Sequence, residues 1–325
     1  MTDPIRWGIL STANIGRKRV IPAMKLARNG VVAAVASRSL DKAEAFAASN
    51  GIPKAYGSYE ELLADPEIDA IYNPLPNSEH ATWSIACAEA GKPTLCEKPL
   101  ASDAADAQRM VDAFNERGVP FAEAFMYRFH PQTTRVKELV DSGAVGEVTT
   151  MQASFSFPIT SEANIRLNSS LAGGALMDVG CYCVNVMRLM TGEEPVDVTA
   201  RAQFGEPSGV DETLAGILVF PSGVIGHFDC GLRSYRTPNY EIRGTEGRIL
   251  VESGFVMEPN EQPVIRHWHG SDYQEIVMPA VNHYTLMAED FADALLNDRP
   301  PRFPGQDGVE NMHVIDRLLA AARAE

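Results

Sequence analysis

Three side chains in this sequence could together transfer a proton while a hydride is exchanged: Lys98, Asp178 and Tyr182. Lys98 ends a short apolar run and stands between an acid and a proline. Asp178 and Tyr182 have the spacing i, i+4, which places two side chains on one face of a helix. A free phenol has a pKa of about 10, too high for an efficient base near neutral pH. An ammonium group within about 4–6 Å favours the phenolate, so we predict that Tyr182 is the acid/base and that Lys98 lies beside it.

Each of these residues also has a structural interpretation. Lys98 could be a surface charge, and Asp178 could be a cap favoured by the dipole at the start of its helix. Tyr182 could be a core aromatic whose hydroxyl is satisfied. The preceding Gly173-Gly174 pair predicts a flexible segment leading into that helix.

The elements that must position these residues alternate between strand and helix over residues 1–124. Short apolar strands are predicted at 5–10, 31–36, 70–73, 94–96 and 120–124, and helices at 15–28, 40–49, 78–90 and 103–117. Buried strands separated by helices predict an α/β fold with a doubly wound, parallel Rossmann-type sheet. We therefore expect residues 1–124 to form a dinucleotide-binding domain.

The pattern changes in the remaining residues, 125–325. Strands are predicted at 148–157, 196–204, 214–220 and 224–230, a hairpin at 240–252, and helices at 130–141, 176–191, 286–296 and 308–323. Such closely spaced strands predict an α+β domain with a large, mostly antiparallel, open-faced sheet. We expect this domain to bind substrate, and its last helices are compatible with packing back on the first domain.

A turn of small residues joins the first predicted strand to the first helix. Ser11, Ala13 and Gly16 occupy the three places of a GxGxxG pattern, in which small residues let the backbone approach a pyrophosphate. The helix N-terminus that follows attracts phosphate. An ordinary strand–helix turn is the alternative. The predicted cofactor contacts in this region are Gly8, Ser11, Thr12, Ala13, Asn14 and Ile15.

The second predicted strand ends in Ser37-Arg38-Ser39, where an NAD site usually has an acid. Arg38 can pair with a 2′-phosphate, and Lys42 follows one turn later. Ser37, Arg38 and Lys42 therefore predict NADP, with NAD as the alternative cofactor; a solvated surface arginine is the structural alternative.

Two loops follow the ends of neighbouring strands, where ligands bind in open α/β sheets. The predicted cofactor contacts from these loops are Pro74, Leu75, Asn77, His80, Glu97 and Lys98. In the second domain, Arg166 and Asn185 are candidate substrate contacts, although Arg166 could equally form a structural ion pair. No metal site is predicted.

The formal net charge of −15 disfavours nucleic acids and anionic membranes as partners. Five cysteines without a CxxC motif suit a reducing compartment. We find neither a signal-peptide pattern nor an apolar run near the length of about 20 residues that spans a bilayer. We expect a cytoplasmic protein.

The sequence resembles the Gfo/Idh/MocA family over essentially its whole length. The resemblance rests on the small-residue turn at 8–16, the loop ending at His80, Glu97-Lys98-Pro99, and the Gly-Gly-x-x-x-Asp-x-Gly stretch at 173–180. It implies NAD(P)-dependent oxidation or reduction of a carbinol carbon in a sugar or polyol. It also implies a homodimer or homotetramer that associates through the C-terminal sheet.

One branch of the family is more similar than the rest. Tyr182 stands where many members have His, and the branch is further indicated by Tyr127-Arg128-Phe129-His130-Pro131 and Arg166-Leu167-Asn168. It includes glucose–fructose oxidoreductase, NADP-dependent D-xylose dehydrogenase and trans-dihydrodiol dehydrogenase. The resemblance implies the acid/base role for Tyr182, a supporting role for Lys98, an orienting role for Asp178 and NADP selection by Arg38.

The expected reaction is oxidation of an aldose such as D-xylose or D-glucose at C1 to a lactone. The alternatives are a trans-dihydrodiol dehydrogenase, a reductase of ketosugars such as 1,5-anhydrofructose, and a non-catalytic NADP-binding sensor. Exported members of the branch with tightly bound cofactor carry an N-terminal extension. This sequence lacks that extension, so an exchangeable cofactor is expected.

Overall fold

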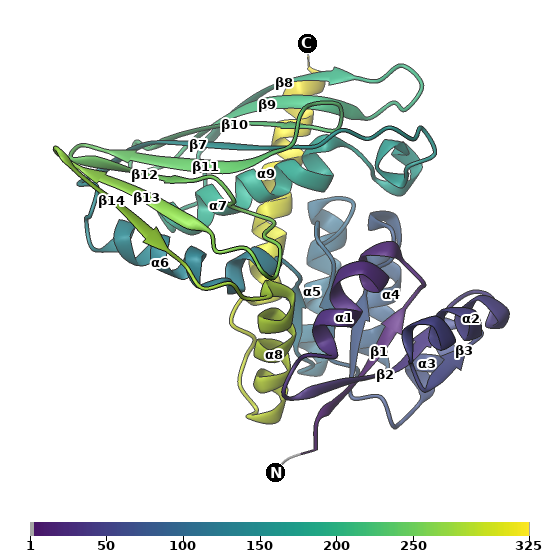
Figure 1. Ribbon diagram of the computed structural model, residues 1–325. Helices are drawn as coiled ribbons and strands as arrows, with labels where there is room; N and C mark the ends of the chain where they lie inside the picture. The colour runs from purple at the N-terminus through teal and green to yellow at the C-terminus, as the bar shows by residue number, and fades with distance from the viewer. Residues whose placement is uncertain (1–2, 325) are drawn as a thin grey trace. The chain divides into compact units, whose positions relative to one another are not determined.

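The computed structural model describes residues 3–324, which fall into two compact units. The first comprises residues up to Met126 together with Tyr284–Val309, and the second comprises Tyr127–His283 and the residues from Glu310 onward. Figure 1 shows the elements of both units in chain order. Each unit is built around its own sheet.

The first unit contains a six-stranded, wholly parallel sheet in the order β3-β2-β1-β4-β5-β6. The strands are β1 (Ile5–Leu10), β2 (Gly30–Ala36), β3 (Lys54–Tyr56), β4 (Ala70–Asn73), β5 (Thr94–Cys96) and β6 (Phe121–Glu123). The predicted doubly wound Rossmann sheet is thereby confirmed. β3 was not predicted, because three half-exposed residues at a sheet edge carry no hydrophobic pattern.

Helices connect these strands. They are α1 (Ile21–Met24), α2 (Leu40–Asn50), α3 (Tyr59–Ala64), α4 (Asn77–Glu89) and α5 (Ala104–Arg117), and a later helix, α8 (His283–Leu296), joins the same unit. The helix expected at 15–28 is shorter, and its Gly16–Val20 segment is a π-helical turn. Although α8 is distant in sequence, it packs on the first strand: the rings of Trp7 and Phe291 lie 5.7 Å apart. Because helices pack on the sheet, its parallel strands are buried, which explains why they are apolar throughout.

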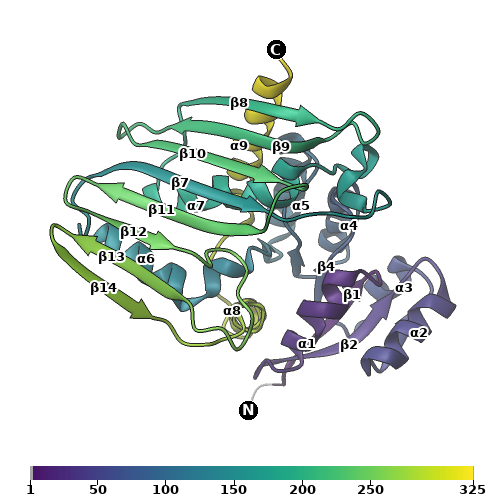
Figure 2. The same cartoon turned by 45° about the horizontal axis from the view of Figure 1, so that its top comes forward.

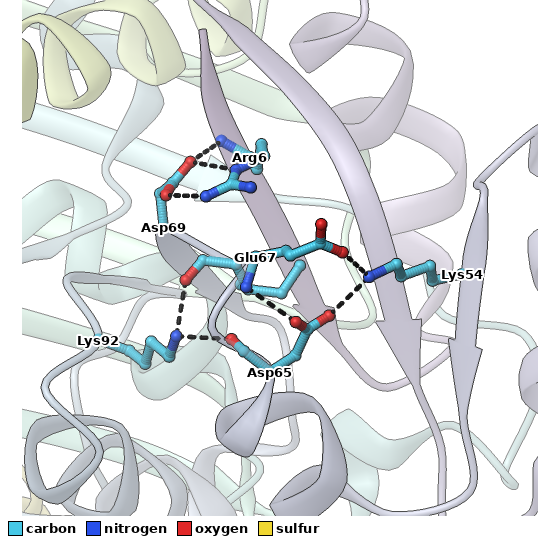
Figure 3. A network of polar contacts seen from close by, with 7 residues as sticks. Arg6, Lys54, Asp65, Glu67, Asp69 and Lys92 are labelled. Atoms are coloured by element: carbon cyan, nitrogen blue, oxygen red, sulfur yellow. Dashed lines mark hydrogen bonds and ion pairs between the residues drawn. The ribbon is translucent and has the colours of Figure 1, made fainter. Parts of the chain in front are cut away.

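A polar network joins the segments that lead into the strands of the first unit (Figure 3). Its members are Arg6, Lys54, Asp65, Glu67, Asp69 and Lys92. The Arg6 guanidinium donates to Asp69 at 2.8 and 2.9 Å, and Lys92 Nζ donates to the carbonyl oxygens of Asp65 (2.8 Å) and Ile68 (2.7 Å). Burial opposes ionisation of Asp65, but hydrogen bonds from Tyr56, from the Glu67 N–H and from Lys54 lower its pKa to about 2. The network lies at the amino ends of these strands, opposite to the carboxyl ends at which open α/β sheets bind ligands.

The second unit contains an eight-stranded sheet in the order β14-β13-β12-β11-β7-β10-β9-β8. The strands are β7 (Val148–Ser156), β8 (Asp197–Phe204), β9 (Asp211–Val219), β10 (Ile225–Gly231), β11 (Thr237–Gly244), β12 (Gly247–Val251), β13 (Val264–His269) and β14 (Asp272–Val277). Only the pair of β7 and β10 is parallel, so the predicted mostly antiparallel sheet is confirmed. The predicted hairpin is also present, with Arg243 opposite Arg248.

Helices α6 (Pro131–Asp141) and α7 (Cys181–Thr191) lie on one face of this sheet (Figures 1 and 2). A π-helical turn, Leu176–Gly180, leads directly into α7 and contacts β7, β9 and β10. Residues of α9 (Gly305–Arg323) reach the same face, since Leu318 packs at Gly216 of β9. Figure 2 shows no helix of the second unit on the opposite face.

One stretch, Ser169–Thr191, is long and apolar enough to cross a membrane by length and composition, contrary to our expectation that no such run exists. However, 72% of its most apolar window is buried inside the structure, as in the core helix of a globular domain. None of the five cysteines forms a disulfide, and all five are buried.

Candidate active site

The turn after β1 has the backbone that a dinucleotide site requires. Ser11 has φ +76°, a left-handed conformation that favours glycine, and its N–H donates to the Ala36 carbonyl oxygen at 2.9 Å. The Ser11 hydroxyl accepts from the Ala13 N–H at 3.3 Å, so this serine stabilises the turn with its own side chain. A helix starts at Asn14, and the N–H groups of a first helical turn have no partner within the helix. Residues 11–15 therefore fit a pyrophosphate.

Gly8 lies inside β1, before the turn. A Cβ at this position would come within 2.8–3.0 Å of the side chains of Leu62, Ile68 and Ile71. Close packing accounts for the glycine here, and a contact between Gly8 and a cofactor stays a prediction.

Two cations follow β2 without carboxylate partners. Ser37 is buried, and its N–H donates to the Tyr56 carbonyl oxygen at 3.1 Å. Arg38 and Lys42 are exposed, and neither forms an ion pair with any residue between 3 and 324. Burial raises the pKa of Tyr59 on α3, an effect that the nearby Arg38 charge partly offsets. In a chain of net charge −15, an unpaired guanidinium at this strand end suits a phosphate dianion.

His80 connects the loops that follow β4 and β5. Its ring is fully buried in the first turn of α4, with Nε2 2.8 Å from the Leu75 carbonyl oxygen and Nδ1 3.0 Å from that of Pro99. Burial lowers the pKa of His80 to about 4. Both ring nitrogens already face backbone carbonyls, so the structure gives His80 a role in joining the two loops, where sequence reasoning expected a cofactor contact. Pro74 lies in the first of these loops, and Asn77 begins α4.

Glu97 and Lys98 differ in their surroundings although they are adjacent. The Glu97 carboxylate is buried and accepts from the Tyr72 hydroxyl at 2.6 Å. Burial and then the Glu97 charge hold the pKa of Tyr72 well above its usual value. Lys98 is half-buried and lies two residues after the end of β5. Glu97 thus anchors the start of the loop in the core, while Lys98 extends from it.

Tyr182 lies in the first turn of α7, within an aromatic cluster. Its ring is 3% exposed and lies 5.8 Å from that of Tyr127, 5.3 Å from Phe155 and 5.6 Å from Phe255. Tyr127 also donates to Asn185 Oδ1 at 2.6 Å, so Tyr182 and Asn185 share a neighbour. Sequence reasoning did not assign Tyr127, Phe155 or Phe255 to the site. For Tyr127, the one indication in the sequence was the run Tyr127-Arg128-Phe129-His130-Pro131, which marks the branch of the family.

Asp178 is paired with Arg166. Arg166 Nε lies 2.6 Å from Asp178 Oδ2, and the guanidinium also lies 5.7 Å from the Phe157 ring centre. The ion-pair alternative for Arg166 is therefore what the structure contains. Asp178 belongs to the π-helical turn before α7, a feature that is frequent at functional sites.

The first unit carries Lys98 and the nucleotide turn, and the second carries Arg166, Asp178, Tyr182 and Asn185. Within the second unit the structure brings Asp178 to Arg166, and Tyr182 and Asn185 to Tyr127. The meeting of Lys98 with Tyr182 stays a prediction. Between residues 3 and 324, no group of three or more His, Cys, Asp or Glu side chains is arranged to hold a metal ion.

A cavity of about 630 Å³ lies elsewhere, on strands β8, β9 and β10, and none of the predicted site residues lines it. It is a hollow of the second sheet, and the chemistry argued above comes from the strand ends of the first unit and from α7.

Two family models match the chain. Residues 5–125 match an oxidoreductase family with an NAD-binding Rossmann fold, and residues 133–250 match the GFO/IDH/MocA C-terminal domain. A relative named D-xylose 1-dehydrogenase (NADP(+)) 2, from Haloferax volcanii, is 38% identical over 317 residues, which cover 97% of this chain and 97% of the relative. A trans-1,2-dihydrobenzene-1,2-diol dehydrogenase from Xenopus laevis is 39% identical over 78% of this chain and 77% of that protein.

The fold is also similar to solved structures. A 3-ketoreductase from Actinomadura kijaniata, in complex with NADP and TDP-benzene, has a TM-score of 0.93 and 32% sequence identity; the match covers 99% of this chain and 98% of the reductase.

Proposed function

The chain belongs to the Gfo/Idh/MocA oxidoreductase family, and from this premise we propose that it is an NADP-dependent sugar dehydrogenase that oxidises an aldose at C1 to a lactone. The observation that carries the proposal is the placement of Tyr182, a buried phenol at the start of α7 that lies among three other aromatic rings. Similarity to a D-xylose dehydrogenase over nearly the whole chain supports the aldose substrate.

The first unit supplies the cofactor site. The turn at residues 11–15 would hold the pyrophosphate with backbone N–H groups, and Arg38 would pair with the 2′-phosphate of NADP. NADP in the structures of a similar reductase supports this choice of cofactor. When bound, the nicotinamide supplies hydride exchange with the carbinol carbon of the substrate.

The second unit supplies the proton chemistry. In the oxidation, Tyr182 Oη takes the proton of the substrate hydroxyl, and in the reverse direction it returns that proton. For Lys98 we propose a supporting role in this proton transfer, because a positive charge near a phenol favours the phenolate. Asp178, held by Arg166, orients this group or a substrate hydroxyl.

Variants of a similar reductase involve the same pair of residue types. The Actinomadura kijaniata reductase has been solved with a tyrosine replaced by phenylalanine and with a lysine replaced by alanine. Asn185 lies within one helical turn of Tyr182 and is our second candidate for a substrate contact. We also propose a cytoplasmic homodimer or homotetramer that associates through the second sheet.

A second function, reduction of a ketosugar or oxidation of a trans-dihydrodiol, is favoured by the names of other relatives. Measuring kcat/KM with NADP or NADPH on D-xylose, D-glucose, a trans-dihydrodiol and 1,5-anhydrofructose would distinguish these substrates. Highest kcat/KM on an aldose supports the proposal, and highest kcat/KM on either of the other two overturns the substrate assignment. NADPH binding without turnover on any of them would indicate a sensor.

Replacing Tyr182 with phenylalanine tests the acid/base role. We expect Tyr182→Phe to lower kcat by a factor of about 10² to 10⁴, because general acid–base catalysis contributes that much. NADPH affinity, measured by fluorescence titration, should stay unchanged, since the nucleotide site lies in the first unit. Tyr273→Phe, an exposed phenol on β14, is the control. Equal turnover in Tyr182→Phe and wild type would refute the role.

A further inference from the structure

Asp211 is a buried carboxylate that sequence reasoning did not single out. It is the first residue of β9 and is 2% exposed. Within residues 3–324 it forms no ion pair, and the charge of Arg323 on α9 acts on it only at longer range. A buried, unpaired carboxylate is costly to keep, which calls for an explanation.

The carboxylate of Asp211 lies at the N-terminus of the helix that carries Tyr182. Asp211 Oδ2 accepts from the Leu176 N–H at 2.7 Å, and the carboxylate also accepts from the Ala175 N–H. Its Oδ1 lies so close to Gly174 that a Cβ there would be 2.2 Å away. Asp211 therefore satisfies N–H groups that the first helical turn cannot satisfy itself, and its negative charge faces the positive end of the helix.

The two glycines before this helix are held by close contacts, which corrects our expectation of a flexible segment. A Cβ at Gly173 would come within 2.4 Å of the Arg166 carbonyl oxygen, and the Gly174 N–H donates to that same oxygen at 2.8 Å. Gly174 also has φ +126°, which side chains rarely tolerate. The turn thus connects Asp211 to the backbone of Arg166, whose guanidinium binds Asp178.

The far end of the π-helical turn is held in the same way. A Cβ at Gly180 would come within 2.8 Å of Cys230 Sγ on β10 and 2.7 Å of Leu176. The segment 174–180 is therefore fixed between two neighbouring strands, β9 through Asp211 and β10 through Cys230. Tyr182 follows two residues later.

We propose that Asp211 is a positioning residue: its carboxylate determines where the helix begins and thereby aims Asp178 and Tyr182. This inference rests on the proposed role of Tyr182.

The charge of Asp211 affects the position of the helix and the stability of the fold in different ways. Burial raises the pKa of Asp211 to about 6. Hydrogen bonds from the N–H groups of Leu176 and Ala175, and the distant charge of Arg323, lower this pKa by a smaller amount. The other titratable neighbour is the Cys230 thiol, whose own pKa burial also raises. An acid with a raised folded-state pKa binds its proton more tightly when folded, so its contribution to stability falls as pH rises through about 6. At pH 7.5 the ionised carboxylate thus destabilises the fold while it holds the helix.

Asp211→Asn keeps the shape that fits Gly174 and removes the charge. At pH 7.5 we expect kcat to fall about 10- to 100-fold, as misplacement of a catalytic group by about 1 Å can do. KM for NADP should stay close to wild type, Tm should not fall, and hydrogen exchange should accelerate in peptides covering 174–180. Asp69→Asn, which breaks a half-exposed ion pair with Arg6 in the first unit, is the control and should leave kcat unchanged.

Wild-type kcat with unchanged exchange at 174–180 would overturn the inference. So would a fall in kcat that accompanies a lowered Tm and faster exchange throughout the second unit, because Asp211 would then be merely structural. If Asp211→Asn does not fold, Asp211→Ser, whose hydroxyl can still accept from one N–H, replaces it in the same measurements. If the wild type turns over no sugar, the proposed function fails, and exchange at 174–180 alone decides whether Asp211 anchors the helix.

Discussion

Ser11 shows how a single residue can depart from a motif and keep its geometry. The left-handed conformation costs a residue with a Cβ about 1–2 kcal/mol relative to glycine. The Ser11 hydroxyl offsets part of this cost by accepting from the Ala13 N–H, a bond that glycine cannot form. The degraded pattern therefore still suits a phosphate-binding turn, because the backbone conformation and the following helix N-terminus have the geometry that such a turn requires.

Arg38 is the residue that should determine cofactor choice. A hydrogen bond to a charged group contributes about 1.5–3 kcal/mol, so we expect Arg38→Ala to raise KM for NADP about 10- to 100-fold. KM for NAD, which lacks the 2′-phosphate, should hardly change. Steady-state kinetics with both cofactors measures this, with Arg109→Ala, an exposed arginine on α5, as the control. Equal changes in both KM values would contradict the assignment.

At the scale of the elements, His80 joins the loops after β4 and β5, and its protonation should couple to stability. The pKa of His80 falls from 6.5 to about 4 because the ring is fully buried. The unfolded chain then binds more protons between these pH values, so the stability that neutral His80 provides is present above about 6.5 and is lost as pH falls toward 4.

We therefore expect His80→Gln to have a lower Tm than wild type at pH 7.5. The Tm difference between the two proteins should be smaller at pH 5. Thermal unfolding of both proteins from pH 8 to pH 5 measures this difference. Comparison with wild type is needed because burial also lowers the pKa of His130 to about 4, and that histidine titrates in both proteins. A Tm difference that is the same at every pH would show that the His80 ring is not held neutral.

At the scale of the whole molecule, the second sheet has one covered and one uncovered face within its unit (Figure 2). The uncovered face carries Ile217 on β9 and Ile225 on β10, each 45% exposed, beside the cavity on β8, β9 and β10. Exposed apolar side chains on a wide sheet are typical of an association surface. They support the proposed oligomer.

Ile225→Glu should reduce the oligomer to the mass of one chain in light scattering coupled to size exclusion. A carboxylate placed at a contact between copies would be buried without a partner. Ile225 is half-exposed within a single chain, so the substitution itself should not disturb the fold. Any fall in Tm of the dissociated form should therefore come from loss of the interface alone. Leu26→Glu, at a 73% exposed site in the first unit, should leave the mass unchanged. An unchanged mass in Ile225→Glu would place the interface elsewhere or exclude the oligomer.

The sequence by itself determined the elements with a strong local pattern. Continuous apolar runs such as 70–73 predicted buried parallel strands, and the hairpin around Gly244–Gly247 was predicted from its turn residues. Strand periodicity and turn conformation depend on neighbouring residues, so they can be read along the chain. Lys98 and Tyr182 were selected for the same kind of reason, because their chemistry is a property of residue type.

Tertiary structure alone decided the roles of residues whose partners are distant in sequence. Asp211 lies 35 residues from the Leu176 N–H that it accepts from, and no local spacing indicates that contact. Phe155 and Phe255 likewise join the cluster around Tyr182 from separate segments, and His80 meets Pro99 only because β4 and β5 are adjacent. Burial and close packing bring such residues together, and both arise only when the sheet has formed.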